Sequence, residues 1–410
     1  MQTQVRVHAY RWVVLAAFMA VNLTIQVLWI SYAPVTLAAS RYYGVDAVGI
    51  GALAMTFMVV YVPLSIPASY LIDRRGLRVA SGFGAVLAGV AGVARGLAGD
   101  RYGVVLAATI GAAVAQPFLL NAWTTVSVRW FPRSQRATAV GLVTLANLVG
   151  AGVGMALTPA LAGSMSLAAI QLVYGAAALV AGLAFVLVVR DRPPTPPDTD
   201  AEQDRALVLD GLRHAVHVRA FLVFLALVFV GMGVFNGVST WVDELVRPRG
   251  FTSTDAGSMG ALLLLGGVLG AVLLAALSDR SRRRTPFLAL AFAAAAPALL
   301  LLAVAGTTAV LFAAAFVLGF FLVSAMPIGM QYAAEITAPT PEGTSNGLVQ
   351  LVGQASVVFV YLMALTRTSG GSFLPSLATL AVLLLAAGLV ALRLPEPVPT
   401  RRPDRVAGAR

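Results

Sequence analysis

The sequence contains no cysteine, no lysine and only three histidines, and only 11% of its 410 residues are charged. Without cysteine, neither disulfide bonds nor thiolate metal sites can form. His8, His214 and His217 all lie outside the long apolar runs, which argues against a haem-ligating protein or a zinc enzyme and predicts no cofactor. Because a soluble domain carries roughly 25% charged residues, this chain is too apolar for an ordinary soluble fold.

Hydrophobic residues make up 59% of the chain, in continuous runs rather than the alternating pattern of outer-membrane strands. The sequence therefore predicts an all-α membrane protein. A membrane crossing needs about 20 apolar residues, and this window gives twelve transmembrane helices. They cover residues 12–38, 47–72, 78–97, 102–127, 137–162, 167–189, 220–244, 256–277, 286–304, 308–333, 343–366 and 374–393. The first run is too long for a signal peptide, whose apolar region has roughly 7–15 residues.

One long polar segment, residues 190–219, separates the first six helices from the last six. It contains the run DRPPTPPDTDAEQD and a short amphipathic stretch near residues 207–216. Because proline-rich, charged sequence cannot bury an apolar face, we expect a flexible linker here. The predicted organisation is an N-terminal six-helix bundle (1–189), the linker, a C-terminal six-helix bundle (220–393) and a tail (394–410).

Arginine is distributed unequally between alternate loops. Of the 28 arginines, 22 fall on the side that carries both termini and the linker, and the other side holds Arg41, Arg95, Arg101, Arg247, Arg249 and Arg367. Positive residues concentrate on the cytoplasmic side, so the sequence predicts an inner-membrane protein with both termini and the linker in the cytoplasm. The net charge of +11 is then a topology signal, and no nucleic-acid partner is expected.

The two halves are related in sequence by one offset. YLIDRRGLR (Tyr70–Arg78) corresponds to ALSDRSRRR (Ala276–Arg284), and VRWFPRSQRATAVGL (Val128–Leu142) corresponds to AEITAPTPEGTSNGL (Ala334–Leu348). Both pairs are 206 residues apart. We therefore expect two pseudo-symmetric six-helix bundles with a substrate site between them near the membrane midplane.

The loop after the second helix reads D-R-R-G-L-R, with Asp73, Arg74, Gly76 and Arg78, and Asp279 with Arg280 forms a weaker copy. An acid at a helix end followed by a glycine turn and basic residues resembles the signature of the major facilitator superfamily of transporters. An acid at such a junction can accept charge-assisted hydrogen bonds from a neighbouring helix N-terminus or an arginine. The alternative is a basic loop that only sets topology. Our hypothesis is that ion pairs hold the cytoplasmic side closed, formed by Asp73, Arg136, Asp279, Glu335 and Glu342.

No Asp, Glu, His or Arg is expected near the middle of any span. This favours facilitated diffusion, or coupling through the gate residues, and argues against a strongly anionic substrate. The polar and aromatic residues expected at that depth are Gln26, Trp29, Gln116, Asn121, Asn236 and Gln354. An amide in hydrocarbon is costly unless it finds a partner or faces water, so these residues either line a cavity or join helices by hydrogen bonds. The π face of Trp29 would suit a weakly hydrated cation, although the ring could equally serve packing.

Five stretches resemble the feline leukaemia virus subgroup C receptor-related family of that superfamily: VLWISYA (Val27–Ala33), MVVYVPLSIPASYLIDRRGLR (Met58–Arg78), AQPF (Ala115–Phe118), GVFNGVST (Gly233–Thr240) and AEITAPTPEGTSNGLVQLVGQ (Ala334–Gln354). The family is linked to choline and ethanolamine transport, to haem export and, in one branch, to a vitamin B6 form. The resemblance implies that Trp29, Gln116 and Gln354 line the cavity. The family's aromatic residue on the seventh helix is Asn236 here, with Trp123 and Trp241 as candidates to compensate. The sequence offers no ligand for haem iron.

These observations predict a monomeric twelve-helix transporter in the lipid bilayer that moves a small organic solute, such as an amine, by rocking of its halves. A multidrug or metabolite efflux carrier of the same fold is the alternative. A membrane-embedded enzyme would need a cluster of acids, histidines or a nucleophile with its base at one depth, and none is visible. A receptor would normally add a soluble domain, for which the linker of about thirty residues is too short.

Overall fold

The computed structural model describes residues 7–195, 197, 208–340, 342–368 and 370–397, and this part of the chain is helical. Twelve stretches are long and apolar enough to cross a membrane, which confirms the predicted number. The N-terminal half contains α1 (Arg11–Ile30), α2 (Thr36–Tyr43), α3 (Ala47–Arg75), α4 (Leu77–Leu97), α5 (Tyr102–Leu120), α6 (Trp123–Trp130), α7 (Arg133–Ala162) and α8 (Leu167–Val188). The C-terminal half contains α10 (Arg219–Thr240), α11 (Val242–Val246), α12 (Ser253–Ser281), α13 (Thr285–Val304), α14 (Thr308–Ile336), α15 (Glu342–Ala355), α16 (Val357–Leu365) and α17 (Leu374–Ala391).

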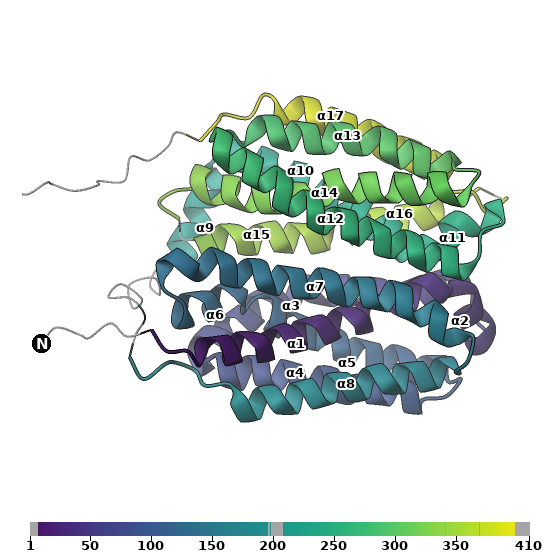
Figure 1. Cartoon of the computed structure of the whole chain (residues 1–410), viewed down its shortest axis with the longest axis horizontal. Helices are drawn as coiled ribbons and strands as arrows, with labels where there is room; N and C mark the ends of the chain where they lie inside the picture. The colour runs from purple at the N-terminus through teal and green to yellow at the C-terminus, as the bar shows by residue number, and fades with distance from the viewer. Residues whose placement is uncertain (1–6, 196, 198–207, 341, 369, 398–410) are drawn as a thin grey trace, which may run out of the picture.

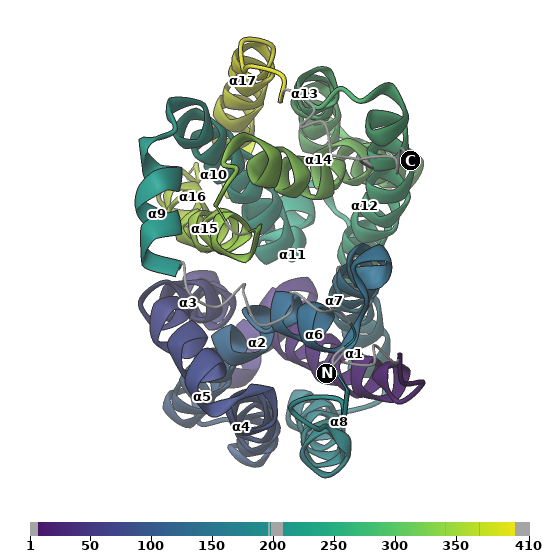
Figure 2. The same cartoon turned by 90° about the vertical axis from the view of Figure 1, so that its left-hand side faces the viewer.

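The two halves form separate layers that face each other along the length of the molecule (Figures 1 and 2). A shift of 206 residues carries α3 onto α12 with the same bounds, as the sequence repeat predicts. The start of α1 and the described parts of the linker lie at one end, the left in Figure 1, and we name this the linker end. The opposite end, where α2 and α11 lie, is named the far end.

Four of the predicted continuous helices are interrupted. The first span stops at Ile30, passes through a short 3-10 turn and resumes as α2, and the fourth, seventh and eleventh spans divide into α5 and α6, α10 and α11, and α15 and α16. In the first span the cause is Pro34, which has no N–H to offer the carbonyl of Ile30. Because hydropathy continues through each interruption, the sequence prediction missed them.

Glycines bring helix backbones into direct contact within each half. In the N-terminal half a Cβ on Gly175 would collide with the backbone of Gly92, which joins α4 to α8. In the C-terminal half a Cβ on Gly319 would collide with the carbonyl of Leu263, which joins α12 to α14. In lipid, no hydrophobic driving force holds helices together. Their association depends on van der Waals packing, and small residues allow the backbones to approach closely enough for it.

An acid in the segment after the last span of each half caps a helix N-terminus. The Asp191 carboxylate accepts from the backbone N of Arg78 at 2.8 Å, and that of Glu396 accepts from the backbone N of Arg284 and Thr285 at 2.9 and 3.0 Å. A negative charge stabilises a helix N-terminus. Gly76 has φ +88° and leaves the space that Asp191 fills, so a side chain is excluded there on both counts.

The described part of the linker includes α9 (Val208–His217), close to the amphipathic helix predicted at 207–216. The carbonyl of Gly211 in α9 accepts from the Thr340 hydroxyl at 3.3 Å, which ties this helix to the segment before α15. Part of the segment predicted to be flexible, residues 196 and 198–207, lies outside the described residues, as do residues 398–410 of the tail.

Candidate functional site

A cavity of about 2220 Å³ lies between the two halves. Its wall includes residues of α1, α3, α5 and α7 from one half and of α10, α12, α14 and α15 from the other. Linker residues Arg192, Pro193 and Leu212 also line it, so the cavity reaches the linker end. A cavity between two pseudo-symmetric bundles is the arrangement in which one site can be exposed to either side of a membrane.

At the far end the halves are in contact and close the cavity. The Trp241 ring, 1% exposed, covers Gly51 of α3, where an added Cβ would lie 2.5 Å from the ring. A Cβ on Gly257 of α12 would likewise lie 2.5 Å from the carbonyl oxygen of Met155 on α7. The structure is therefore open at the linker end and sealed at the far end.

A cluster of charged groups crosses the far-end seal. Asp243, 1% exposed, accepts from the backbone N of Leu37 in the other half at 3.1 Å and also pairs with Arg247. Glu244 pairs with Arg367 at 2.6 Å and with Arg247 at 3.6 Å. Leu37 is the second residue of α2, so the Asp243 carboxylate caps that helix across the interface.

All six residues expected at mid-membrane depth line the cavity: Gln26, Trp29, Gln116, Asn121, Asn236 and Gln354. In three of them a buried polar atom has no hydrogen-bond partner among the described residues: Nε1 of Trp29 and Oε1 of both Gln26 and Gln116. An unpaired polar group in a protein interior is costly, and such groups gather where a ligand completes them. These three atoms are buried, and the side chains that carry them belong to the cavity wall.

Asn121 and Asn236 are already occupied in bonds to the protein. Asn121 accepts from the Tyr61 hydroxyl and donates to the Ser65 carbonyl at 2.8 Å, which joins α5 to α3. Asn236 donates to the Gly353 carbonyl at 3.3 Å and to Ser356 Oγ at 3.1 Å, at the interruption between α15 and α16. Their amides thus hold interrupted helices together, the alternative considered for mid-membrane amides.

A network that the sequence analysis missed forms the adjoining wall. The Gln26 amide donates to Asn147 Oδ1 at 2.7 Å, Asn147 donates to Asn22 Oδ1 at 3.5 Å, and the Trp123 indole donates to the same Asn22 oxygen at 2.9 Å. Asn22 and Asn147 were detectable as rare amides inside apolar runs. Trp123 lines the cavity, whereas Trp241 belongs to the far-end seal, so of these two tryptophans only Trp123 can supplement Trp29.

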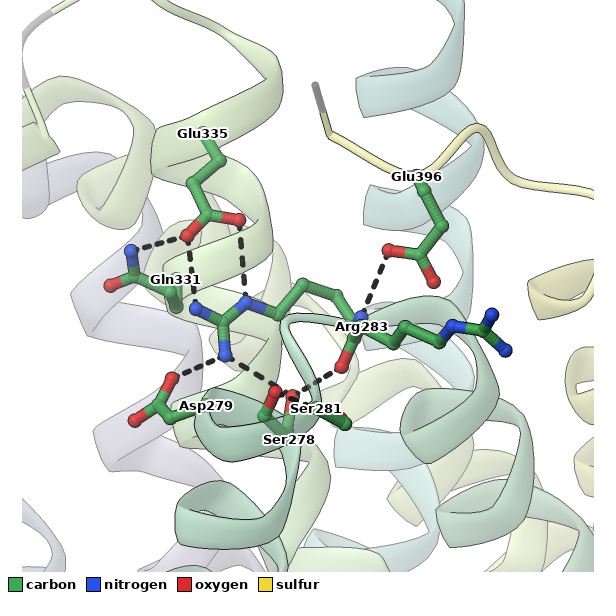
Figure 3. Close-up of polar contacts among 8 residues, drawn as sticks. Ser278, Asp279, Ser281, Arg283, Gln331, Glu335 and Glu396 are labelled. Carbon is green, nitrogen blue, oxygen red and sulfur yellow. Dashed lines mark hydrogen bonds and ion pairs between the residues drawn. The ribbon is translucent and has the colours of Figure 1, made fainter. Parts of the chain in front are cut away.

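At the linker end, Arg284 forms ion pairs with two acids of the C-terminal half (Figure 3). Its guanidinium pairs with Asp279 and with Glu335 at 3.0 Å, and Gln331 donates to Glu335 at 2.6 Å. Burial acts to lower the pKa of Arg284, but the two acids outweigh it and the pKa is raised. Asp279 and Glu335 thus pair within one half, through an arginine that the sequence analysis assigned only to topology.

The other predicted gate residues are distributed around this end. Asp73 and Arg136 line the cavity, and Arg280 is exposed. Arg74 donates to the Tyr70 hydroxyl at 2.8 Å, and the Arg78 side chain donates to the Val186 carbonyl at 3.0 Å. The side chain of Glu342 lies outside the described part of the structure. Since the cavity is open here, closure by these residues stays a prediction.

We expect Arg284→Gln to lower the free energy of unfolding by about 1–2 kcal/mol, because Glu335 and Ser278 would lose a charged donor. Thermal unfolding of the detergent-solubilised protein measures this. Arg283→Gln is the matched control, since the neighbouring Arg283 side chain is exposed and the residue is bonded to Ser278 through its backbone N–H and carbonyl. Equal losses in both variants would show that Arg284 has no special part in this network.

Comparison with known families decides the class of the protein. The sequence model of the Major Facilitator Superfamily matches residues 13–360, and a second match covers residues 244–409. The chain belongs to this superfamily. It is therefore a multi-pass membrane transporter with a small-molecule substrate, and not an enzyme, as the sequence analysis predicts.

The relatives of this transporter include the choline/ethanolamine transporter flvcr2b of Danio rerio, 27% identical over 403 residues that cover 93% of this chain and 83% of the relative. Solute carrier family 49 member A3 of Xenopus tropicalis is also 27% identical, over 90% of this chain and 81% of its own. These matches agree with the resemblance drawn from the quoted stretches.

Solved structures share the fold. A bacterial homologue of the human lysosomal transporter Spinster, in an inward-facing and unoccupied conformation, superposes with a TM-score of 0.75 at 15% identity, covering 95% of this chain and 97% of that one. The human organic anion transporter MFSD10 gives 0.69 at 16% identity, covering 94% and 99%. This confirms the major facilitator fold that the sequence predicts.

Proposed function

We propose that this transporter moves a small organic amine related to choline or ethanolamine across the inner (cell) membrane by alternating access. The observation that carries the proposal is that Trp29, Gln26 and Gln116 line one cavity, and that each has a buried polar atom without a hydrogen-bond partner among the described residues. A cation can lie on the indole face, and the two amide oxygens can accept from an ammonium or a hydroxyl. Relatives named for choline and ethanolamine transport support the same chemistry.

The proposed orientation places the linker end in the cytoplasm, because 22 of the 28 arginines belong to that side. The cavity would then be in its inward-open state. Asp73 is the only acid on the described cavity wall, and it lies at the end of α3 rather than beside Trp29. A carrier that has no titratable acid beside its solute is suited to facilitated diffusion. We propose that it works as a monomer.

The free amide oxygens favour a primary amine at least as strongly as a quaternary one. Because Asn236 stands where relatives of the family carry an aromatic ring, and is bonded to Gly353 and Ser356, a cage of two rings around a trimethylammonium group is incomplete. An ethanolamine ammonium can instead donate N–H bonds to Gln26 and Gln116. We therefore expect ethanolamine to bind at least as tightly as choline.

A thermal-shift screen of the purified transporter against ethanolamine, choline, betaine, pyridoxine, haem and bulky apolar cations tests the proposal. A ligand that binds the folded state raises the melting temperature by mass action. We expect stabilisation by ethanolamine and choline that is lost in Trp29→Ala and in Gln116→Leu. If neither amine stabilises the native protein, the proposed substrate class is wrong.

A second candidate, efflux of bulky apolar cations, is favoured by the opposite wall. Met232, Phe235, Met326 and Met330 line the cavity there, and methionine-rich surfaces adapt to varied apolar shapes. In the same screen, an efflux carrier would be stabilised by the bulky cations and not by ethanolamine, and this stabilisation would survive Gln116→Leu.

A further inference from the structure

Arg95, in the last turn of α4, is fully buried although its helix ends at the far side of the membrane. By its place in the sequence it belongs with the arginines of the loops at that side. It is 0% exposed, and none of the ion pairs among the described residues includes it. Burying an unpaired cation costs several kcal/mol, so this position needs a physical reason.

The contacts of Arg95 all lie at the place where α1 ends. Its Nη1 donates to the Leu28 carbonyl at 2.7 Å and its Nη2 donates to Ser31 Oγ at 3.5 Å, while its guanidinium carbon lies 4.7 Å from the centre of the Tyr32 ring. The last carbonyls of a helix lack partners within the helix, and a cation there is favourable. Arg95 therefore caps the interrupted end of α1 from a neighbouring helix.

This anchored segment contains Trp29. The Leu28 side chain packs against Gly92 of α4, where an added Cβ would lie 3.1 Å from a Leu28 methyl group, and Gln171 of α8 bonds Ser31 at 3.2 Å. Leu28 and Ser31 are thus held by contacts to α4 and α8 on the side of α1 away from the cavity. Trp29, between them, lines the cavity on the other face.

We propose that Arg95 is a positioning residue for Trp29: it fixes where α1 ends and thereby sets the direction of the indole in the cavity. The planar guanidinium suits this role because it can bond two groups while stacking on Tyr32, which a lysine ammonium cannot do. The inference rests on the proposed function only for its effect on amine binding, because the position of the Trp29 ring can be measured without any solute.

The first test needs no ligand. The protein is labelled with 5-fluorotryptophan, and the ¹⁹F resonance of Trp29 among its five tryptophans is identified by its loss in Trp29→Phe. Arg95→Gln should shift or split that resonance and leave those of Trp12 and Trp130 in place. Arg95→Lys, which keeps the charge, should change the Trp29 resonance less than Arg95→Gln does. It replaces Arg95→Gln in this test if the glutamine variant does not fold.

Arg249→Gln is the matched control. The half-buried Arg249 also donates to helix carbonyls, those of Leu302 and Ala305 at 2.6 and 3.1 Å, but at the end of α13 in the other half. It should cost similar stability and leave the Trp29 resonance unchanged. A Trp29 resonance that moves equally in both variants, or in neither, would overturn the proposal.

A double-mutant cycle then tests the consequence in binding. Arg95→Gln should weaken ethanolamine binding about tenfold in the native background and less than about twofold in Trp29→Ala, because residues that act through one another are not additive. Additive effects would contradict the positioning role. If the ¹⁹F shift occurs but the native protein binds no amine, Arg95 still positions Trp29 and only the proposed substrate is wrong.

Discussion

Replacing Trp29 by alanine should weaken the binding of ethanolamine or choline about 30-fold while the protein remains folded. A desolvated cation on an indole face contributes about 2 kcal/mol, and 1.4 kcal/mol corresponds to a factor of ten. Asn236, which donates to Ser356, has no aromatic ring with which to share the cation. Isothermal titration of the purified protein with each amine measures the loss.

Trp12→Ala is the control for the removal of an indole. Trp12 lies near the start of α1, is 42% exposed and does not line the cavity. Its loss should leave amine affinity within about twofold of the native value, since exposed substitutions away from a site have small effects. Equal losses in the two variants would mean that Trp29 does not contact the amine.

Gly257→Val should shift the conformational equilibrium of the transporter toward the state that is open at the far end. A Cβ at Gly257 would lie 2.5 Å from the Met155 carbonyl oxygen and 2.7 Å from Pro159, both on α7 of the other half. Overpacking of this kind costs about 2 kcal/mol, which changes a population ratio roughly 30-fold. Only the state in which the far end is sealed bears this cost.

Distances between spin labels measure the shift. The chain has no cysteine, so a thiol-specific spin label reacts only with the two cysteines introduced in Arg41→Cys and Thr308→Cys. Both positions are exposed, one at the far end of each half. Gly257→Val should lengthen this distance, whereas Gly306→Val should not, because nothing lies within 4 Å of a Cβ at Gly306. An unchanged distance in Gly257→Val would contradict the assignment of the far-end contacts as a conformational seal.

Much of the fold could be predicted from the sequence because hydrocarbon imposes strict rules. Every backbone polar group must be satisfied within the span, so apolar runs of sufficient length become helices. The rarity of amides in such runs also drew attention to Gln26, Gln116 and Gln354, which lie on the cavity wall. Their part in binding stays a prediction.

The details that shape the site were beyond the sequence, for two physical reasons. Helix interruptions such as that at Ile30 do not change hydropathy, although they expose the carbonyls that Arg95 caps. Ion pairs depend on which helices become neighbours. The sequence shows Arg284 only as one of several loop arginines, whereas the packing of α12 against α14 brings it to Asp279 and Glu335. The Asp243 bond to Leu37 likewise needs both halves.

Uptake into proteoliposomes tests the central claim most directly. Purified transporter is reconstituted, and the entry of radiolabelled ethanolamine and choline is followed without an imposed ion gradient, with Gly257→Val and Trp29→Ala vesicles alongside. We predict saturable uptake of both amines. Each amine should inhibit the uptake of the other, and both variants should show strongly reduced uptake. Uptake no faster than in protein-free vesicles would contradict the account, as would uptake that Trp29→Ala leaves unchanged.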